Sequence, residues 1–144
     1  MPLKRFEWNS RIKTVELDYR IARYAFDRLM ENAQLIKTDF KYRDIARASG
    51  MLEATYTILL IAEFETGLRM YWETIRSTHP KTEDLLNGLA ARLGIPNQLI
   101  EDAHLVREYR NDLIHEREDI GHPISIDASR DHLCAFFYRL PPNW

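Results

Sequence analysis

Apolar residues recur in steps of three and four along two long stretches of the chain. This spacing places them on one face of an α-helix, and its persistence over several turns is typical of helices that pack nearly parallel to a neighbour. The pattern therefore predicts a helical bundle, with Asn9 or Ser10 capping the first helix. The first row is Ile12, Val15, Tyr19, Ala22, Phe26, Leu29, Ala33 and Ile36, and the second is Ala54, Ile58, Ile61, Leu68, Trp72 and Ile75.

A shorter apolar row follows another side of the first helix. Two neighbours within one bundle would explain it, and so would contact with a second subunit. The sequence leaves both interpretations open. The row consists of Leu17, Ile21, Tyr24 and Leu35.

Glycine and proline are too scarce for the many turns of an all-β chain. The 144 residues include five Gly and six Pro, of which two form Pro141-Pro142 near the C-terminus. The length suits one hydrophobic core and is short for two domains. We therefore predict one all-α domain over residues 1–144, an up-and-down helical bundle of four to five helices.

Proline, glycine and capping residues predict where the later helices begin and end. We expect a central helix that starts between residues 39 and 51 and ends at His79-Pro80, then a short capped helix from Thr82 to Gly94. A helix from Pro96 to Arg117 follows. The last helix is capped by Ser125 or Asp127, stops at Pro141, and carries Leu133, Phe136, Phe137 and Leu140.

Two opposite charges interrupt the apolar rows. Arg110 falls within the buried stripe expected of its helix, and Glu65 falls on the inner line of the central helix. A guanidinium group keeps its charge in proteins, so its burial costs several kcal/mol unless an acid or a phosphate meets it. We predict that Arg110 pairs with Glu65, although Glu65 could instead lie at the solvated edge of its row. The stripe around Arg110 is Leu99, Ala103, Val106, Leu113 and Ile114.

The segment Arg110-Asn111, followed by three residues and His115, resembles the signature of the HEPN family (higher eukaryotes and prokaryotes nucleotide-binding domains). That signature is an Arg, four to six residues and a His, commonly with a polar residue directly after the Arg. The expected order of helices is also similar to that of the family, including the apolar run that ends at Glu65 on the second helix. The resemblance thus covers nearly the whole chain and implies a HEPN-like fold.

The resemblance implies a metal-independent endoribonuclease of the toxin or defence type. In such enzymes the ribose 2′-hydroxyl attacks the adjacent phosphate and leaves a 2′,3′-cyclic phosphate. His115 would act as the base, Arg110 would stabilise the charge on phosphorus, and Asn111 would bind the imidazole ring or the substrate. We count Glu65, His104 and Arg107 as supporting residues.

The spacing of Arg110 and His115 raises a geometric problem. Residues five apart on an α-helix are separated by about 140° around the axis and about 7.5 Å along it, so the two side chains diverge within one intact helix. Either the helix loosens before His115, or a second copy of the chain completes the site across a two-fold axis. The resemblance favours the second, a homodimer with facing motifs.

Charge is unevenly distributed along the chain. Residues 1–50 hold 11 basic against 7 acidic side chains, and residues 51–144 hold 9 against 15, for a net charge of −2. Solvated helix faces would explain this, as would a first helix that supplies phosphate contacts. The acids near the motif, which repel RNA phosphates, are Glu101, Asp102, Glu108, Asp112, Glu116, Glu118 and Asp119.

The acidic surroundings favour a competing hypothesis, a non-catalytic HEPN-like module that binds RNA, a nucleotide or another protein. A plain dimerisation bundle would account for the apolar rows and not for Arg110. The expected partners are RNA, a second copy of the chain, and a cognate antitoxin or regulatory protein. No membrane partner is expected, because the sequence has no uninterrupted apolar run of 18 residues and its N-terminus carries an acid, so we expect neither a membrane span nor a signal peptide.

Other catalytic and metal-binding motifs are missing from the sequence. The single Cys134 has neither a second Cys nor paired His residues at metal-ligand spacing, and there is no Gly-rich phosphate loop, His-Glu-x-x-His pair or Gly-x-Ser-x-Gly motif. We therefore expect no metal and no cofactor. One unpaired cysteine also fits the reducing cytoplasm, which is the predicted location.

Overall fold

The computed structural model describes residues 3–32, 39–116 and 118–144, and these residues form five α-helices without a strand. The prediction of an all-α chain with four to five helices is confirmed for them. In chain order the helices are α1 (Arg5–Glu31), α2 (Tyr42–Glu73), α3 (Thr82–Leu93), α4 (Asn97–Ile114) and α5 (Ile126–Phe137).

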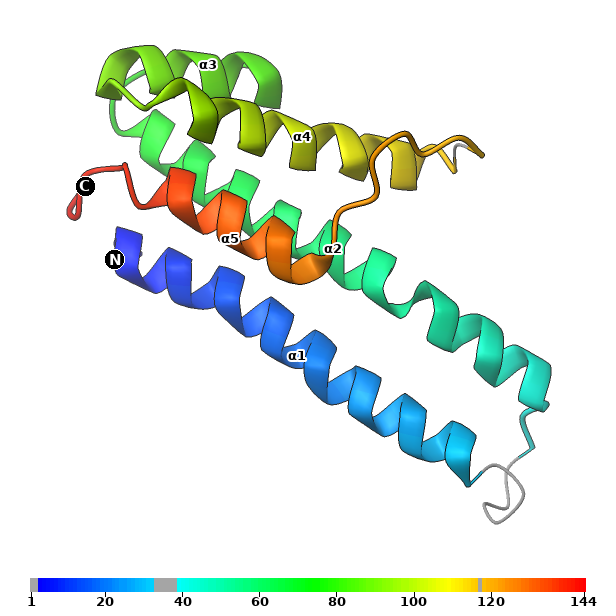
Figure 1. Cartoon of the computed structure of the whole chain (residues 1–144). Helices are drawn as coiled ribbons and strands as arrows, with labels where there is room; N and C mark the ends of the chain where they lie inside the picture. The colour runs from blue at the N-terminus through cyan, green and yellow to red at the C-terminus, as the bar shows by residue number, and fades with distance from the viewer. Residues whose placement is uncertain (1–2, 33–38, 117) are drawn as a thin grey trace.

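Helix α2 is the central element and packs against each of the other four helices. It runs antiparallel to α1, and α5 lies against α1, α2 and α4 (Figure 1). Helix α3 packs against the C-terminal end of α2 and against the first half of α4 (Figure 1). The last turns of α1 and the first turns of α2 extend beyond the other helices as a two-helix arm (Figure 1).

The core is aromatic where α1, α2 and α5 meet. Phe64 of α2 contacts Phe136 and Phe137 of α5 edge to face, with ring centres 5.9 and 6.1 Å apart. The helices approach closely here because Gly67 carries no side chain: a Cβ at that position would lie 2.8 Å from the Phe137 ring and 3.1 Å from Trp8. The four apolar residues predicted for the last helix, Leu133, Phe136, Phe137 and Leu140, are all buried.

Helix α1 starts earlier than predicted. The Glu7 carboxylate accepts a hydrogen bond from the Lys4 backbone N–H at 2.6 Å and ties down the first turn. Asn9 and Ser10 therefore lie inside the helix, and the prediction that one of them caps it is wrong. The second apolar row is exposed at Leu17, Ile21 and Tyr24, so no other described element of the chain covers it. Ala33, Leu35 and Ile36 lie outside the described residues.

The boundaries of the middle helices agree with the sequence only in part. Helix α2 begins within the predicted interval at Tyr42, but it ends at Glu73, before His79, because the Thr74 hydroxyl and N–H both donate to the Tyr71 carbonyl. Gly94 ends α3 with a left-handed φ of 63°, as expected. Thr82 is the first residue of α3 rather than its cap.

The ends of the last two helices also differ from the prediction. Helix α4 stops at Ile114 because Glu116 turns the chain with a φ of 48°. Arg117, the predicted end, lies outside the described residues. Ile114 is 46% exposed, contrary to its assignment to the buried stripe, since it points about 80° away from Val106 on an ideal helix. Of the two candidate caps of α5, Ser125 is the one that accepts a hydrogen bond, from Ala128 N–H at 3.1 Å.

Helix α2 is long and apolar enough to cross a membrane by the criteria of length and composition, with 33% of its most apolar window buried. Core helices of proteins without a membrane span meet the same criteria. Because α2 packs against four helices here, its apolar character also follows from its central place in the fold.

A pair of glycine substitutions tests the close packing of α2. Gly67→Ala should lower the free energy of unfolding by about 1–3 kcal/mol, because the new methyl group overlaps Phe137 and the interior cannot expand cheaply. Gly50→Ala is the matched control, since it lies in the same helix with no atom within 4 Å of its Cβ position. It should raise stability by about 0.5–1 kcal/mol. Urea denaturation of both variants measures the difference, and equal effects would contradict the packing described.

Candidate functional site

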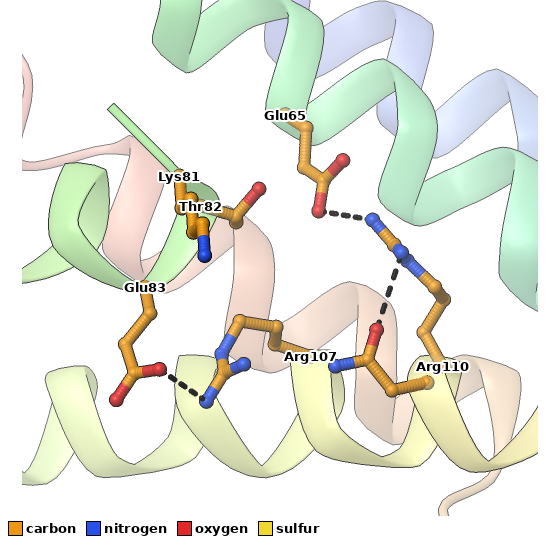
Figure 2. A pocket seen from close by; sticks show the side chains of 7 residues that line it. Glu65, Lys81, Thr82, Glu83, Arg107 and Arg110 are labelled. Carbon is orange, nitrogen blue, oxygen red and sulfur yellow. Dashed lines mark hydrogen bonds and ion pairs between the residues drawn. The ribbon is translucent and has the colours of Figure 1, made fainter. Parts of the chain in front are cut away.

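The predicted ion pair between Arg110 and Glu65 is present and joins α4 to α2. Arg110 Nη2 donates to Glu65 Oε1 at 2.5 Å. The two side chains are 23% and 15% exposed, so Glu65 lies between the helices rather than at a solvated edge. Figure 2 shows this contact between the Arg110 guanidinium group and Glu65. Part of the Arg110 side chain remains open to solvent.

Asn111 fixes the guanidinium group from a second direction. Its Oδ1 accepts a hydrogen bond from Arg110 Nη1 at 3.2 Å. This oxygen is therefore directed at Arg110, whereas the contact of Asn111 with His115 is through the backbone, from His115 N–H to the Asn111 carbonyl at 3.0 Å. Together Glu65 and Asn111 restrict how Arg110 can point.

His115 is the residue that directly follows α4. It forms the C-cap with φ −84° and ψ 5°, and its side chain is exposed. The helix therefore does end before the histidine, which is one of the two geometries expected from the spacing. Even so, His115 does not line the pocket that contains Arg110.

The Arg110 pocket has a volume of about 200 Å³ and lies between α2, α4 and the start of α3. Figure 2 shows Lys81, Thr82 and Glu83 entering it from the start of α3, opposite Arg107 and Arg110 of α4. Those three residues were not identified from the sequence. The short connection through Ile95 and Pro96, which folds α3 back onto α4, was the signal that could have located them. The lining residues are Glu65, Lys81, Thr82, Glu83, Arg107, Arg110 and Asn111.

Arg107 is the second cation of this pocket and is shared between two acids. Its Nη2 lies 3.6 Å from Glu83 and 3.7 Å from Glu108. Its Nε donates to His104 Nδ1 at 3.4 Å. Arg107 thus connects the Arg110 pocket with the neighbouring surface, where His104 lies.

His104 occupies a separate position and is held as a neutral ring. Its Nε2 lies 2.8 Å from Asn87 Oδ1, and its Nδ1 accepts from Arg107, so the proton belongs on Nε2. Burial lowers the pKa of His104 below its ordinary value, and the nearby Arg107 charge lowers it further. The structure places His104 beside Arg107 rather than among the residues that line the Arg110 pocket.

The arrangement brings Arg110, Asn111, Glu65 and Arg107 together and leaves His115 and His104 outside. Two guanidinium groups and the Lys81 ammonium in one pocket can bind an anion such as a phosphate. Glu83 and Glu65 already form ion pairs with Arg107 and Arg110 and so neutralise part of this positive charge. Among the described residues there is no group of three or more His, Cys, Asp or Glu that could hold a metal ion.

Comparisons with protein-family models, with curated proteins and with solved structures found no match for this chain.

A double-mutant cycle tests whether Arg110 and Glu65 stabilise the fold as a pair. Arg110→Met and Glu65→Gln should each lower the free energy of unfolding. The double variant should lower it by less than the sum of the two single effects. We expect a coupling free energy of about 1–3 kcal/mol, between the values typical of exposed and of fully buried pairs.

The exposed pair of Arg28 and Glu31, 3.7 Å apart, is the control for this cycle. Its coupling in Arg28→Met and Glu31→Gln should stay below about 0.5 kcal/mol because both groups are solvated. Additive effects at Arg110 and Glu65 would contradict the pairing.

Proposed function

We propose that this chain is a HEPN-like, metal-independent endoribonuclease that cuts RNA with Arg110 and His115. The observation that carries the proposal is the fixed guanidinium group of Arg110, which is held by Glu65 and Asn111 and lies five residues before His115, the exposed C-cap residue of the same helix. An arginine that only stabilises the fold requires an acidic partner. It requires neither a hydrogen bond to the adjacent amide nor a pocket that is partly open to solvent.

The proposed reaction is a transesterification at phosphorus. His115 takes the proton of the ribose 2′-hydroxyl, the 2′-oxygen attacks the adjacent phosphate, and the bond to the 5′-oxygen breaks. The products are a 2′,3′-cyclic phosphate and a 5′-hydroxyl, whose proton comes from solvent or from the histidine of a second copy. Arg110 stabilises the charge on the phosphorane, and because Glu65 and Asn111 each accept at only one nitrogen, further N–H groups remain for the phosphate.

A homodimer is part of the proposal, because His115 lies outside the Arg110 pocket of its own chain. The support comes from the exposed residues of α2 between Met51 and Met70, which form an uncharged row along about five turns. Ala62 and Thr66 of this row flank Glu65, so a second copy seated there would lie beside the Arg110–Glu65 pair. We name the row the outer face of α2, and it consists of Met51, Thr55, Leu59, Ala62, Thr66 and Met70.

A non-catalytic HEPN-like module that binds RNA, a nucleotide or a protein is the second candidate. Two observations favour it: His115 is separated from the Arg110 pocket, and Arg107 and Arg110 already have carboxylate partners. Acids near the motif would also weaken RNA binding there. Under this candidate the pocket binds its ligand without cutting it.

The biological setting follows from the proposed activity. A ribonuclease of the toxin or defence type requires control, and a cognate antitoxin or regulatory protein would provide it. We propose a cytoplasmic location, where RNA is present and where the unpaired thiol of Cys134 stays reduced.

Substitution of the motif histidine tests the catalytic proposal. His115→Ala should lower RNA cleavage in excess chelator by about 10²-fold or more, because the reaction loses its base. Since the side chain is exposed, the melting temperature should change little. Asn111→Ala should reduce cleavage less, because Glu65 still holds Arg110.

The matched control is His122→Ala, which removes another exposed histidine from the loop before α5. It should cleave like the unaltered protein. Undiminished cleavage by a folded His115→Ala protein would contradict the mechanism. If purified unaltered protein cleaves no RNA at all, the non-catalytic module replaces the ribonuclease.

Light scattering tests the proposed dimer. The unaltered chain should be a dimer at micromolar concentration, and Leu59→Glu should dissociate it, because it places a charge in the centre of the outer face of α2. Ile21→Glu is the comparison, since Ile21 is equally apolar and exposed but lies on α1. Dissociation by Ile21→Glu and not by Leu59→Glu would place the interface on α1 and contradict the proposal, as would an unaltered monomer.

A further inference from the structure

A second polar pocket, remote in sequence from the motif, lies where the start of α1 meets the end of α5. Its volume is about 140 Å³. Neither the proposed mechanism nor the packing of the core uses it. We name it the α1–α5 pocket, and its lining residues are Arg5, Phe6, Asn9, Ser10, Lys13 and Tyr138.

Two exposed aromatic rings border the α1–α5 pocket. Phe6 is 76% exposed and Tyr138 is 61% exposed, so both rings are accessible to a ligand. Arg5 fixes the Tyr138 side of the pocket: its guanidinium carbon lies 4.7 Å from the ring centre, and its Nη1 donates to the carbonyls of Tyr138 and Leu140 at 2.9 and 2.6 Å. The pocket therefore has a preformed aromatic and cationic wall.

Asn9 supplies an unused amide at this pocket. The residue is only 4% exposed, and neither Oδ1 nor Nδ2 has a hydrogen-bond partner in the structure. Leaving a buried polar group unpaired costs about 1–3 kcal/mol, and an amide leaves both a donor and an acceptor unmet. The edge of a nucleobase offers the complementary acceptor and donor. Both amide atoms are covered in this structure, so a ligand reaches them only after a neighbouring side chain moves aside.

The charge of the α1–α5 pocket also differs from that of three other pockets in the described chain. Arg5 and Lys13 line it, and none of its lining residues is an acid. Lys13 is exposed and has no ion-pair partner among the described side chains. Three other pockets within the described chain each include an acid: Glu65 and Glu83 in the Arg110 pocket, Glu83 with Glu101 and Glu108 beside it, and Asp44 in the two-helix arm.

We propose that the α1–α5 pocket binds one nucleotide of single-stranded RNA. The base stacks against Tyr138 and Phe6, the Asn9 amide pairs with its edge, and Lys13 contacts the phosphate. The choice of RNA as the ligand rests on the proposed function. This pocket then provides the affinity that the acidic surroundings of the motif lack, and it holds a strand segment away from the cleaved bond.

Fluorescence anisotropy with labelled single-stranded 12-nucleotide RNA tests the proposal in the whole chain with the substitution His115→Ala, which should bind RNA and not cleave it. Phe6→Ala and Tyr138→Ala should each raise the Kd about 10-fold, within the range for loss of one base stack. Lys13→Glu should raise the Kd and reduce its dependence on salt. The controls are Tyr42→Ala and Lys41→Glu at the far end of the molecule, which should leave the Kd within about 2-fold.

Asn9→Leu separates recognition of the base from stabilisation of the fold. Removal of an unpaired buried amide should keep or raise the melting temperature. If Asn9 pairs with a base, the variant should also lose the difference in Kd between oligomers of uridine, cytidine and adenosine that the parent protein shows. An unchanged order of preference in a stable variant would overturn the role of Asn9.

The outcomes distinguish this proposal from the ribonuclease. If the unaltered protein cleaves RNA and the Phe6 and Tyr138 variants keep its Kd, only the proposal of RNA binding at the α1–α5 pocket is overturned. If RNA binding depends on these residues and no cleavage occurs, only the proposal of ribonuclease activity is overturned. Equally tight binding of duplex RNA, in which the bases are not free to stack on a protein, would also overturn the proposal, as would binding of no RNA.

Discussion

The ion pair between Arg110 and Glu65 is the constraint on which the relation between fold and site depends. A permanent positive charge on the inner side of α4 requires an acid opposite it, and the central helix supplies one at 2.5 Å. The pair therefore sets the register of α4 against α2. It also fixes where the guanidinium group meets solvent, because Asn111 binds a second nitrogen of the same group.

Much of this fold could be predicted from the sequence, because apolar spacing and two misplaced charges carry strong physical signals. The residues missed were those whose positions depend on packing between distant segments. Asn9 has the side chain of a helix cap, yet the bond from Lys4 to Glu7 starts α1 earlier. Glu83 meets Arg107 only because α3 folds back onto α4, which no periodicity within either helix reveals.

Charge separates the molecule into regions with different proposed tasks. The motif end of α4 is acidic and would hold RNA weakly, although its arginines can stabilise a phosphorane. The start of α1 is basic and aromatic, with Arg5, Phe6 and Lys13 around an uncharged amide. In our proposal binding of the strand and its cleavage occur at different places, which would account for a catalytic motif in acidic surroundings.

The chemical form of the product ends tests the central claim most directly. Attack by the 2′-hydroxyl, with His115 as base and Arg110 on the phosphate, can only leave a 2′,3′-cyclic phosphate and a 5′-hydroxyl. Mass spectrometry of a short RNA incubated with the protein in excess chelator identifies the new 3′ end and the new 5′ end of the products. We predict a 2′,3′-cyclic phosphate at the first and a hydroxyl group at the second. Products with a 3′-hydroxyl and a 5′-phosphate would require water as the nucleophile and would contradict the proposed mechanism.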